Sequence, residues 1–231
     1  MADSNEGDAS GDDDAAERRG SRPVAGVVLA GGRSTRFEGG DKALATVDGE
    51  PMLARVVDAL ATVTRVVVVN CRADQRDAFA AALDDTGVDV GVRFALDERP
   101  DEGPVAGLAS ALACVDAPVV VVAACDLPWL DPALVQWLAG ALEGGDAASP
   151  ESAAEDAVDA VVPVVGGYPK PTCAAYGTDA LAAAVDETLA AGSRRFRDVL
   201  DALAIREVDV RESGFSTRSL ADVDSRADLE R

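Results

Sequence analysis

The sequence predicts one three-layer α/β/α domain, in which helices cover both faces of a mostly parallel sheet. Two observations lead to this fold class. Short runs of β-branched residues alternate with stretches of helical periodicity from Pro23 almost to the C-terminus, without an internal repeat. The length of 231 residues is also enough for one such domain with a sizeable core. We therefore expect a Rossmann-like domain over residues 23–231, with ligands at the carboxyl ends of its strands.

The first 22 residues have a different composition. They are rich in Asp, Gly, Ser and Glu and contain almost no apolar side chains. Such a segment buries too little apolar surface to offset the entropy lost on ordering, so we expect a disordered acidic tail at residues 1–22. A signal peptide would begin with basic residues followed by an apolar stretch, and the tail has neither.

Residues 23–142 show the alternation most regularly. Val24–Ala30 is a β-branched run that ends at two glycines, as expected for a buried parallel strand. Pro118–Ala124 is the most strongly β-like segment and should be central in the sheet. Further strands are expected at Arg65–Asn70 and Val88–Leu96, and helices at Pro51–Thr62, Ala73–Leu83, Pro104–Val115 and Asp131–Leu142.

The second half follows a segment, residues 143–157, whose Ala, Ser, Gly and acidic residues predict a surface loop. Strands are then expected at Ala157–Val165, Thr172–Tyr176 and Ile205–Val210, and helices at Asp179–Ala191, Arg194–Ala204 and Ser225–Glu230.

Charge and composition exclude several classes of protein. The formal net charge of −21 repels nucleic-acid phosphates and anionic membranes, so neither is expected as a partner. Adaptation to a salt-rich cytoplasm accounts for the acidity better than an acidic functional surface does. The chain has no histidine, which excludes a Ser-His-Asp triad and a His-based zinc site. Its four cysteines lack C-x-x-C spacing and are expected to be small buried side chains in a reducing cytosol.

The first candidate site is the glycine-rich segment Leu29–Lys42. Its four glycines let the backbone approach a ligand closely, and its amides with Arg36 and Lys42 would form a positive concavity suited to a triphosphate. Lys42 is one of only two lysines in the chain, the other being Lys170 between two prolines. The segment matches neither the P-loop nor the dinucleotide fingerprint, and a flexible turn is the alternative interpretation.

Two acidic residues are the next candidates. Asp126 lies just beyond the strand predicted at Pro118–Ala124, where a carboxylate suits Mg²⁺, although a turn or capping Asp would look the same. Asp97 ends another predicted strand and is followed by Gly103-Pro104, which would open a helix with its amides toward the same crevice. A plain helix start is the alternative there.

Three motifs together are characteristic of one protein family. They are Leu-Ala-Gly-Gly-x-x-x-Arg with Asp-Lys in residues 29–42, Asp97 with Gly-Pro-Val-Ala-Gly at residues 103–107, and Cys-Asp-Leu-Pro at residues 125–128. In these motifs the chain resembles the molybdenum cofactor guanylyltransferases, nucleotidyltransferases of the sugar-nucleotide-synthesis type, from about Val24 to Leu229. The resemblance implies a nucleotide-diphospho-sugar-transferase-like fold, with a nucleotide-binding part at about 23–142 and an acceptor-binding part at about 158–231.

The resemblance also implies roles for individual residues. Catalysis would depend on Arg36, Lys42 and Asp126, with Asp126 holding Mg²⁺. The residues implied to bind GTP are Leu29, Ala30, Gly31, Gly32, Lys42, Asn70, Asp97 and Asp126. Those implied on the acceptor side are Lys170, Pro171, Tyr176, Arg194 and Arg195. For the two arginines, a solvent-exposed helix start is an equally good interpretation.

One motif departs from the family pattern. Where the family usually has Asn-x-Asn-Thr-Pro, this chain has Asp222-Val223-Asp224-Ser225-Arg226. Asp224 is a candidate second ligand for the metal.

The activity implied is transfer of GMP from GTP to the terminal phosphate of molybdopterin, with release of pyrophosphate, in the cytoplasm. Transient contact with other proteins of molybdenum cofactor synthesis is expected as well. Alternatives with the same fold are cytidylyl transfer to molybdopterin and guanylyl transfer to a cobinamide phosphate. An alternative of another class is a non-catalytic GTP-binding subunit that handles the cofactor.

Overall fold

The structure is a computed structural model that describes residues 22–33, 37, 40–87, 89–97, 102–144 and 158–230. The expected acidic tail, the expected loop at 143–157 and Arg36 lie wholly or almost wholly outside these residues.

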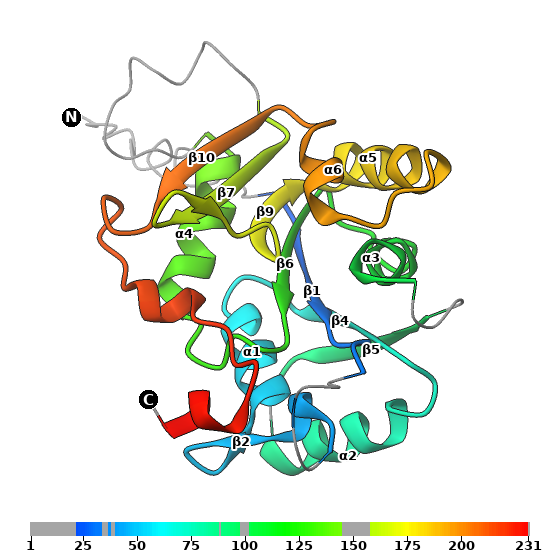
Figure 1. The fold of residues 1–231 in the computed structure, drawn as a ribbon, viewed down its shortest axis with the longest axis vertical. Coiled ribbons are helices and arrows are strands. Elements are labelled where there is room, and N and C mark those ends of the chain that lie inside the picture. The colour runs from blue at the N-terminus through cyan, green and yellow to red at the C-terminus, as the bar shows by residue number, and fades with distance from the viewer. Residues whose placement is uncertain are drawn as a thin grey trace, which may run out of the picture.

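A mostly parallel sheet forms the centre of the described chain (Figure 1). Its strand order is β10-β7-β9-β6-β1-β4-β5, with β8 beside β7. The strands are β1 (Val24–Leu29), β4 (Val66–Cys71), β5 (Gly91–Leu96), β6 (Val119–Ala124), β7 (Ala160–Val165), β8 (Tyr168–Pro169), β9 (Cys173–Gly177) and β10 (Ile205–Asp209). β6 lies between β1 and β9, so the expectation of a central strand there is confirmed.

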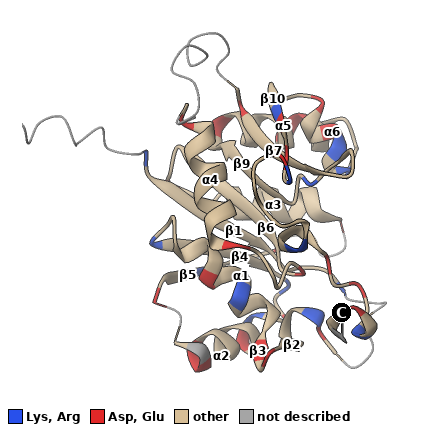
Figure 2. Cartoon of the chain, turned by 90° about the vertical axis from the view of Figure 1, so that its left-hand side faces the viewer, with Lys and Arg blue, Asp and Glu red and all other residues tan. Residues whose placement is uncertain are grey.

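Helices cover both faces of the sheet, which confirms the predicted three layers. One face packs against α1 (Met52–Ala61), α2 (Arg76–Thr86) and α4 (Pro132–Leu142). The other packs against α3 (Pro104–Leu112), α5 (Thr178–Ala190) and α6 (Phe196–Leu200). Charged residues lie mainly on loops and outer helix faces, while most strands carry none (Figure 2). The central strands are uncharged because both of their faces are buried.

The sheet reverses its strand order beside β1. From β1 the chain proceeds outward through β4 and β5, and it then returns to place β6 on the other side of β1. All of these neighbours are parallel, and Leu29 pairs with both Asn70 and Ala124. The carboxyl ends of β1, β4 and β6 therefore lie at one edge, with a crevice at the switch point of a doubly wound sheet.

Several sequence predictions of element type and limits are wrong. The helix predicted at Ala73–Leu83 begins only at Arg76, since residues 73–75 form a turn. The helix predicted at Arg194–Ala204 shrinks to α6, and the one at Ser225–Glu230 is the 3₁₀ segment η4 (Arg226–Glu230).

Some short elements were not predicted at all. They are the hairpin of β2 (Thr46–Val47) and β3 (Glu50–Pro51), strand β8, and the 3₁₀ turns η2 (Lys42–Leu44) and η3 (Thr217–Leu220). β9 runs antiparallel to both β6 and β7, which residue patterns along one strand cannot specify because they carry no information on its direction.

Three of the four cysteines are buried as the sequence predicted, while Cys114 is only partly buried. All four are free, and Cys71, Cys125 and Cys173 are buried. Burial raises the pKa of the Cys71 thiol to about 11 and that of Cys173 to about 12, and it raises the pKa of Cys125 as well. These three thiols are therefore protonated at neutral pH and act as small apolar side chains.

Helix α3 approaches the sheet closely at Gly107. A Cβ atom placed there would overlap the side-chain oxygen of Asn70 and lie 3.0 Å from its Cγ. The Asn70 side chain cannot move aside, because it is 3% exposed and donates to Ala95 O and Asp97 Oδ1. Gly107 is therefore required by space rather than by backbone conformation.

We expect Gly107→Ala to destabilise the fold. Overpacking of this kind costs about 1–3 kcal/mol, which lowers the melting temperature of a domain of this size by roughly 2–12 °C. Gly140→Ala in α4 is the matched control, because a Cβ there meets nothing within 4 Å. It should stabilise the protein by about 0.5–1 kcal/mol through helix propensity. Equal melting temperatures for the two variants would contradict this account.

Candidate functional site

A cavity of about 400 Å³ lies at the carboxyl edge of β1, β4 and β6, as expected from the strand order. Its wall contains residues from the glycine-rich loop, from the ends of these strands and from the start of α3. The lining residues are Leu29, Gly31, Gly32, Arg33, Lys42, Asn70, Asp97, Glu102, Gly103, Pro104, Ala124, Cys125, Asp126 and Thr172. Of the residues predicted to bind nucleotide, Ala30 alone is absent from this lining. It is buried, and its N–H donates to Asn70 O.

Lys42 and Asp126 meet in this cavity. The Nζ of Lys42 lies 2.5 Å from Asp126 Oδ2, and both side chains are about four-fifths buried. Lys42 is the first residue of η2, which Asp41 caps by accepting a hydrogen bond from Ala43 N. Asp126 is the second residue after β6. The tertiary fold thus joins two residues that are 84 positions apart.

The electrostatics keep Lys42 charged. Burial by itself lowers the pKa of this ammonium group, but the charge and hydrogen bond of Asp126, with a further contribution from Asp224, outweigh burial. The net result is a pKa above the ordinary value of 10.5. Lys42 is therefore a permanent cation at neutral pH.

Asp224 approaches the same ammonium group from the C-terminal segment. Its Oδ1 lies 3.9 Å from Lys42 Nζ, and its side chain is 61% exposed. The backbone holds this segment in place, since Val223 N donates to Asp126 O at 3.0 Å. Two carboxylates from separate parts of the chain therefore face one cation. Oxygen ligands of this kind fit Mg²⁺, which uses one or two protein carboxylates and takes its other ligands from water and phosphates.

No cluster of three or more metal-ligating side chains exists among the described residues. A metal at this edge would therefore depend on substrate oxygens in addition to Asp126 and Asp224.

The far end of the cavity is built by Asn70 and Asp97. Asn70 Nδ2 donates to Asp97 Oδ1 at 2.6 Å. The pair is enclosed by two glycines, because a Cβ at Gly31 would come within 2.5 Å of Asp97 Oδ2 and a Cβ at Gly107 would overlap Asn70. Asn70 and Asp97 are thus fixed, and their oxygens remain available as hydrogen-bond acceptors.

Two polar residues behind the loop were not predicted from the sequence. Arg72 Nη1 donates to Gly31 O at 2.9 Å and to Gly32 O at 2.7 Å. Gln75, which is 4% exposed, donates to Ala30 O and to Asp41 Oδ2. One signal was available, because both residues lie in the turn that follows β4 at the same edge of the sheet.

Among the residues expected on the acceptor side, Lys170 lines a cavity and Tyr176 is buried in the core. Lys170 lies 3.2 Å from Asp222 and lines a smaller cavity of about 150 Å³ that Asp126 and Thr172 also line. Tyr176 is fully buried, and its hydroxyl donates to Pro171 O at 2.7 Å. A direct contact of Tyr176 with an acceptor therefore does not fit this structure. Its ring belongs to the core, and its hydroxyl supports the Lys170–Thr172 segment.

Of the two arginines before α6, only Arg194 is seen in contact with residues that line the cavity of about 400 Å³, namely Glu102 and Gly103. Arg194 Nη2 is 3.3 Å from Glu102 Oε1, and its Cβ and backbone oxygen face Gly103. Arg195 is the exposed N-cap residue of α6. Arg194 therefore connects the second half of the chain to the start of α3.

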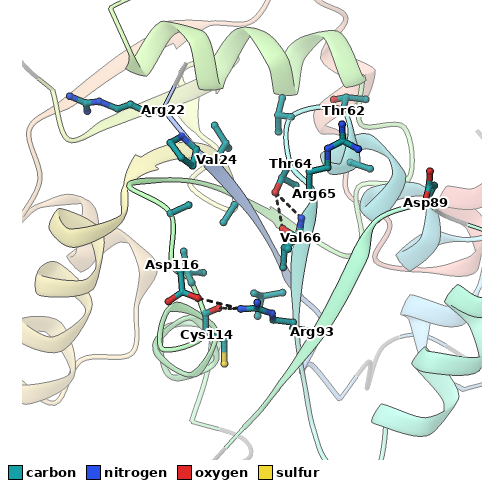
Figure 3. A pocket seen from close by; sticks show the side chains of 17 residues that line it. Arg22, Val24, Thr62, Thr64, Arg65, Val66, Asp89, Arg93, Cys114 and Asp116 are labelled. Carbon is teal, nitrogen blue, oxygen red and sulfur yellow. Dashed lines mark hydrogen bonds and ion pairs between the residues drawn. The ribbon is translucent and has the colours of Figure 1, made fainter. Parts of the chain in front are cut away.

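A further cavity lies at the opposite edge of the sheet (Figure 3). It has about 640 Å³ and is lined at the amino ends of β1, β4 and β5. Arg93 points there toward Asp116 and Cys114 O, at the C-terminal end of α3. A cation is favourable at that end of a helix, and ligands of doubly wound sheets bind at the other edge. The contacts of Arg93 are therefore explained by the end of α3, and we do not assign a ligand to this cavity.

Comparisons with known proteins agree with this geometry. Residues 26–208 match the family described as MobA-like NTP transferase domain. A protein of Haloferax mediterranei described as a "probable molybdenum cofactor guanylyltransferase" is 41% identical over 188 residues, which are 81% of each chain. One of Natronomonas pharaonis with the same description is 38% identical over 209 residues, covering 89% of this chain and 95% of the relative.

A solved structure supports the fold. The molybdopterin-guanine dinucleotide biosynthesis protein A of Archaeoglobus fulgidus superposes with a TM-score of 0.66 at 23% identity, over 90% of this chain and 95% of the other. All residues that line the cavity of about 400 Å³ lie within residues 26–208, which match the family. The similarity to the two relatives extends over most of the chain. The chain therefore belongs to the family of MobA-like NTP transferases and is a nucleotidyltransferase.

Proposed function

We propose that this protein transfers GMP from GTP to the terminal phosphate of molybdopterin and releases pyrophosphate. One observation carries the proposal: the glycine loop, Lys42 and Asp126 meet in one cavity whose far end is the fixed Asn70–Asp97 pair. The names of two relatives, which are 41% and 38% identical to this chain, support the choice of reaction.

The two ends of the cavity suit the two ends of GTP. The Asn70–Asp97 pair offers oxygen acceptors, and the nucleoside of GTP presents N–H and O–H donors. Lys42 and the loop amides offer donors and positive charge to the phosphates. Arg36 would add a bidentate contact to the phosphates, and it remains an expectation because it lies outside the described residues.

The reaction forms a bond from a molybdopterin phosphate oxygen to the α-phosphorus of GTP. The bond from that phosphorus to its bridging oxygen breaks, and pyrophosphate leaves with the electron pair. The attacking phosphate monoester is already an anion near neutral pH, so no side chain needs to remove a proton. The protein contributes position and charge, in that Lys42 is a permanent cation beside the departing phosphates.

The donor set fits a magnesium ion, which Asp126 and Asp224 would hold. When bound there, Mg²⁺ would neutralise phosphate charge and orient the triphosphate.

The acceptor belongs on the side of the smaller cavity. Lys170 and Thr172 line it next to Asp126, so an acceptor placed there would have its phosphate close to the α-phosphate of GTP. In this assignment residues 23–142 hold the nucleotide and residues 158–231 hold the acceptor. Pro171 keeps the Lys170 segment in place through its contact with Tyr176, and Arg194 and Arg195 stay candidates for the acceptor's phosphate.

We further place the protein in the cytoplasm, in transient contact with other proteins of molybdenum cofactor synthesis. Among the described residues, each helix is too short or too polar to span a bilayer.

The deciding experiment is pyrophosphate release from GTP and from CTP, each with purified molybdopterin and Mg²⁺. We expect release with GTP at a kcat/KM at least tenfold above that with CTP. A preference for CTP would favour cytidylyl transfer, and turnover only with a cobinamide phosphate would favour the other guanylyl transfer. GTP binding without pyrophosphate release from any acceptor would indicate a non-catalytic subunit.

Lys42→Ala and Asp126→Ala should each remove most of the activity while the protein stays folded. Loss of one preorganised electrostatic group at a reacting centre costs on the order of 10²–10³ in kcat. Asp186→Ala, on the exposed face of α5, is the control for loss of a carboxylate and should behave as wild type. Circular dichroism checks folding, and near-wild-type turnover of either cavity variant would refute the site assignment.

Asp224→Asn should change the metal requirement rather than abolish turnover. Asp224 is exposed and farther from Lys42 than Asp126 is, so we expect it to be the weaker ligand. The Mg²⁺ concentration for half-maximal activity should rise several-fold, with activity restored at saturating Mg²⁺. An unchanged Mg²⁺ titration would remove Asp224 from the metal site.

A further inference from the structure

The glycine loop is held from behind by side chains that do not line the cavity. Arg72 and Gln75 donate to the carbonyl oxygens of three successive residues, Ala30, Gly31 and Gly32. Neither Arg72 nor Gln75 lines the cavity, whereas Gly31 and Gly32 do. The loop therefore has one face toward these two side chains and another toward the cavity.

The covalent geometry of the backbone fixes what the other face presents. In a trans peptide the C=O of one residue and the N–H of the next point in opposite directions. Carbonyls directed at Arg72 and Gln75 therefore direct the N–H groups of Gly31, Gly32 and Arg33 away from them. Gly31 and Gly32 N–H have no acceptor within the described part of the chain. These donors remain available to an anionic ligand.

The same network connects both ends of the loop. The Gln75 amide, besides holding Ala30 and Gly32, donates to Asp41 Oδ2. The other oxygen of Asp41 caps η2, which begins with Lys42. The position of the Lys42 ammonium group is thus coupled to the amides at the start of the loop.

The network is also ordered internally. Arg72 is 13% exposed, its Nε donates to Asp74 at 3.1 Å, and its backbone N–H donates to Gln75 Oε1 at 2.9 Å. Each donor is therefore preset in direction before a ligand arrives. Such preorganisation lowers the entropy cost of binding.

We infer that Arg72 and Gln75 are positioning residues for the triphosphate of the nucleotide: they turn the loop amides toward the phosphates and fix Lys42 relative to them. The inference rests on the proposed function, in which this loop binds the phosphates of GTP. It assigns to Arg72 an action through backbone geometry rather than contact with the ligand.

The test compares binding of GTP, with Mg²⁺, and of guanosine, which has no phosphates. Arg72→Gln should raise the Kd for GTP at least tenfold and change the Kd for guanosine less than twofold. Arg76→Gln is the matched control, because it removes the same charge from an arginine four residues away that is 54% exposed and pairs only with Asp77 and the Phe94 ring in the described structure. It should match wild type for both ligands.

A second variant separates geometry from charge. Gln75→Met keeps the volume and the net charge but removes every donor of the side chain, and it should also weaken GTP at least fivefold while leaving guanosine within twofold. A purely electrostatic action of Arg72 predicts wild-type behaviour for Gln75→Met, and that result would overturn the inference. Equal weakening of GTP and guanosine by Arg72→Gln, or equal effects of Arg72→Gln and Arg76→Gln, would overturn it as well.

Measurements on the wild-type protein separate failure of the proposed function from failure of the roles assigned to Arg72 and Gln75. If it bound no GTP, the proposed function would fail and this inference with it. If it bound GTP and released pyrophosphate with molybdopterin while Arg72→Gln matched Arg76→Gln, only the inference would fail. Melting temperatures of all variants, measured in the same salt, exclude unfolding as the cause of a loss.

Discussion

The parallel register of β1 between β4 and β6 is the constraint on which the site depends. Leu29 pairs with Asn70 on one side and with Ala124 on the other, so three strands end at one level. Gly31, Asn70 and Asp126, which lie at or within two residues of these paired positions, must then lie at one edge. A shift of one strand by a residue would move these side chains and turn each buried valine of that strand to the opposite face of the sheet, against the wrong helices.

Packing and polarity are balanced differently at the two ends of the cavity. At one end, Gly31 and Gly107 leave just enough space for the Asn70–Asp97 pair, so sterics fix the polar groups. At the other end, side-chain hydrogen bonds from Arg72 and Gln75 to the carbonyl oxygens of residues 30–32 hold the glycine loop. Close packing around a polar pair and hydrogen bonds behind a loop have the same result. Both provide donors and acceptors that need not reorganise on binding.

Charge in this protein also has two distinct functions. Most of the described acidic residues are exposed, where charge affects solubility and association more than the fold. In the cavity the charges are few and paired, with Lys42 facing Asp126 and Asp224. The near-absence of lysine elsewhere in the chain makes the position of Lys42 informative, since arginine supplies almost all other positive charge.

The sequence by itself determined the fold class, the order of most elements and the principal cavity residues. These follow from local patterns: the β-branched runs, the two glycines after Leu29, and Asp97 and Asp126 at strand ends. Only the tertiary structure decided the antiparallel direction of β9, the buried place of Tyr176, the approach of Asp224 to Lys42 and the contacts of Arg72 and Gln75 with the loop. Each of these depends on which distant segments pack together. The physical reason is that side-chain periodicity indicates which face of an element is buried, but it does not indicate which element packs against that face.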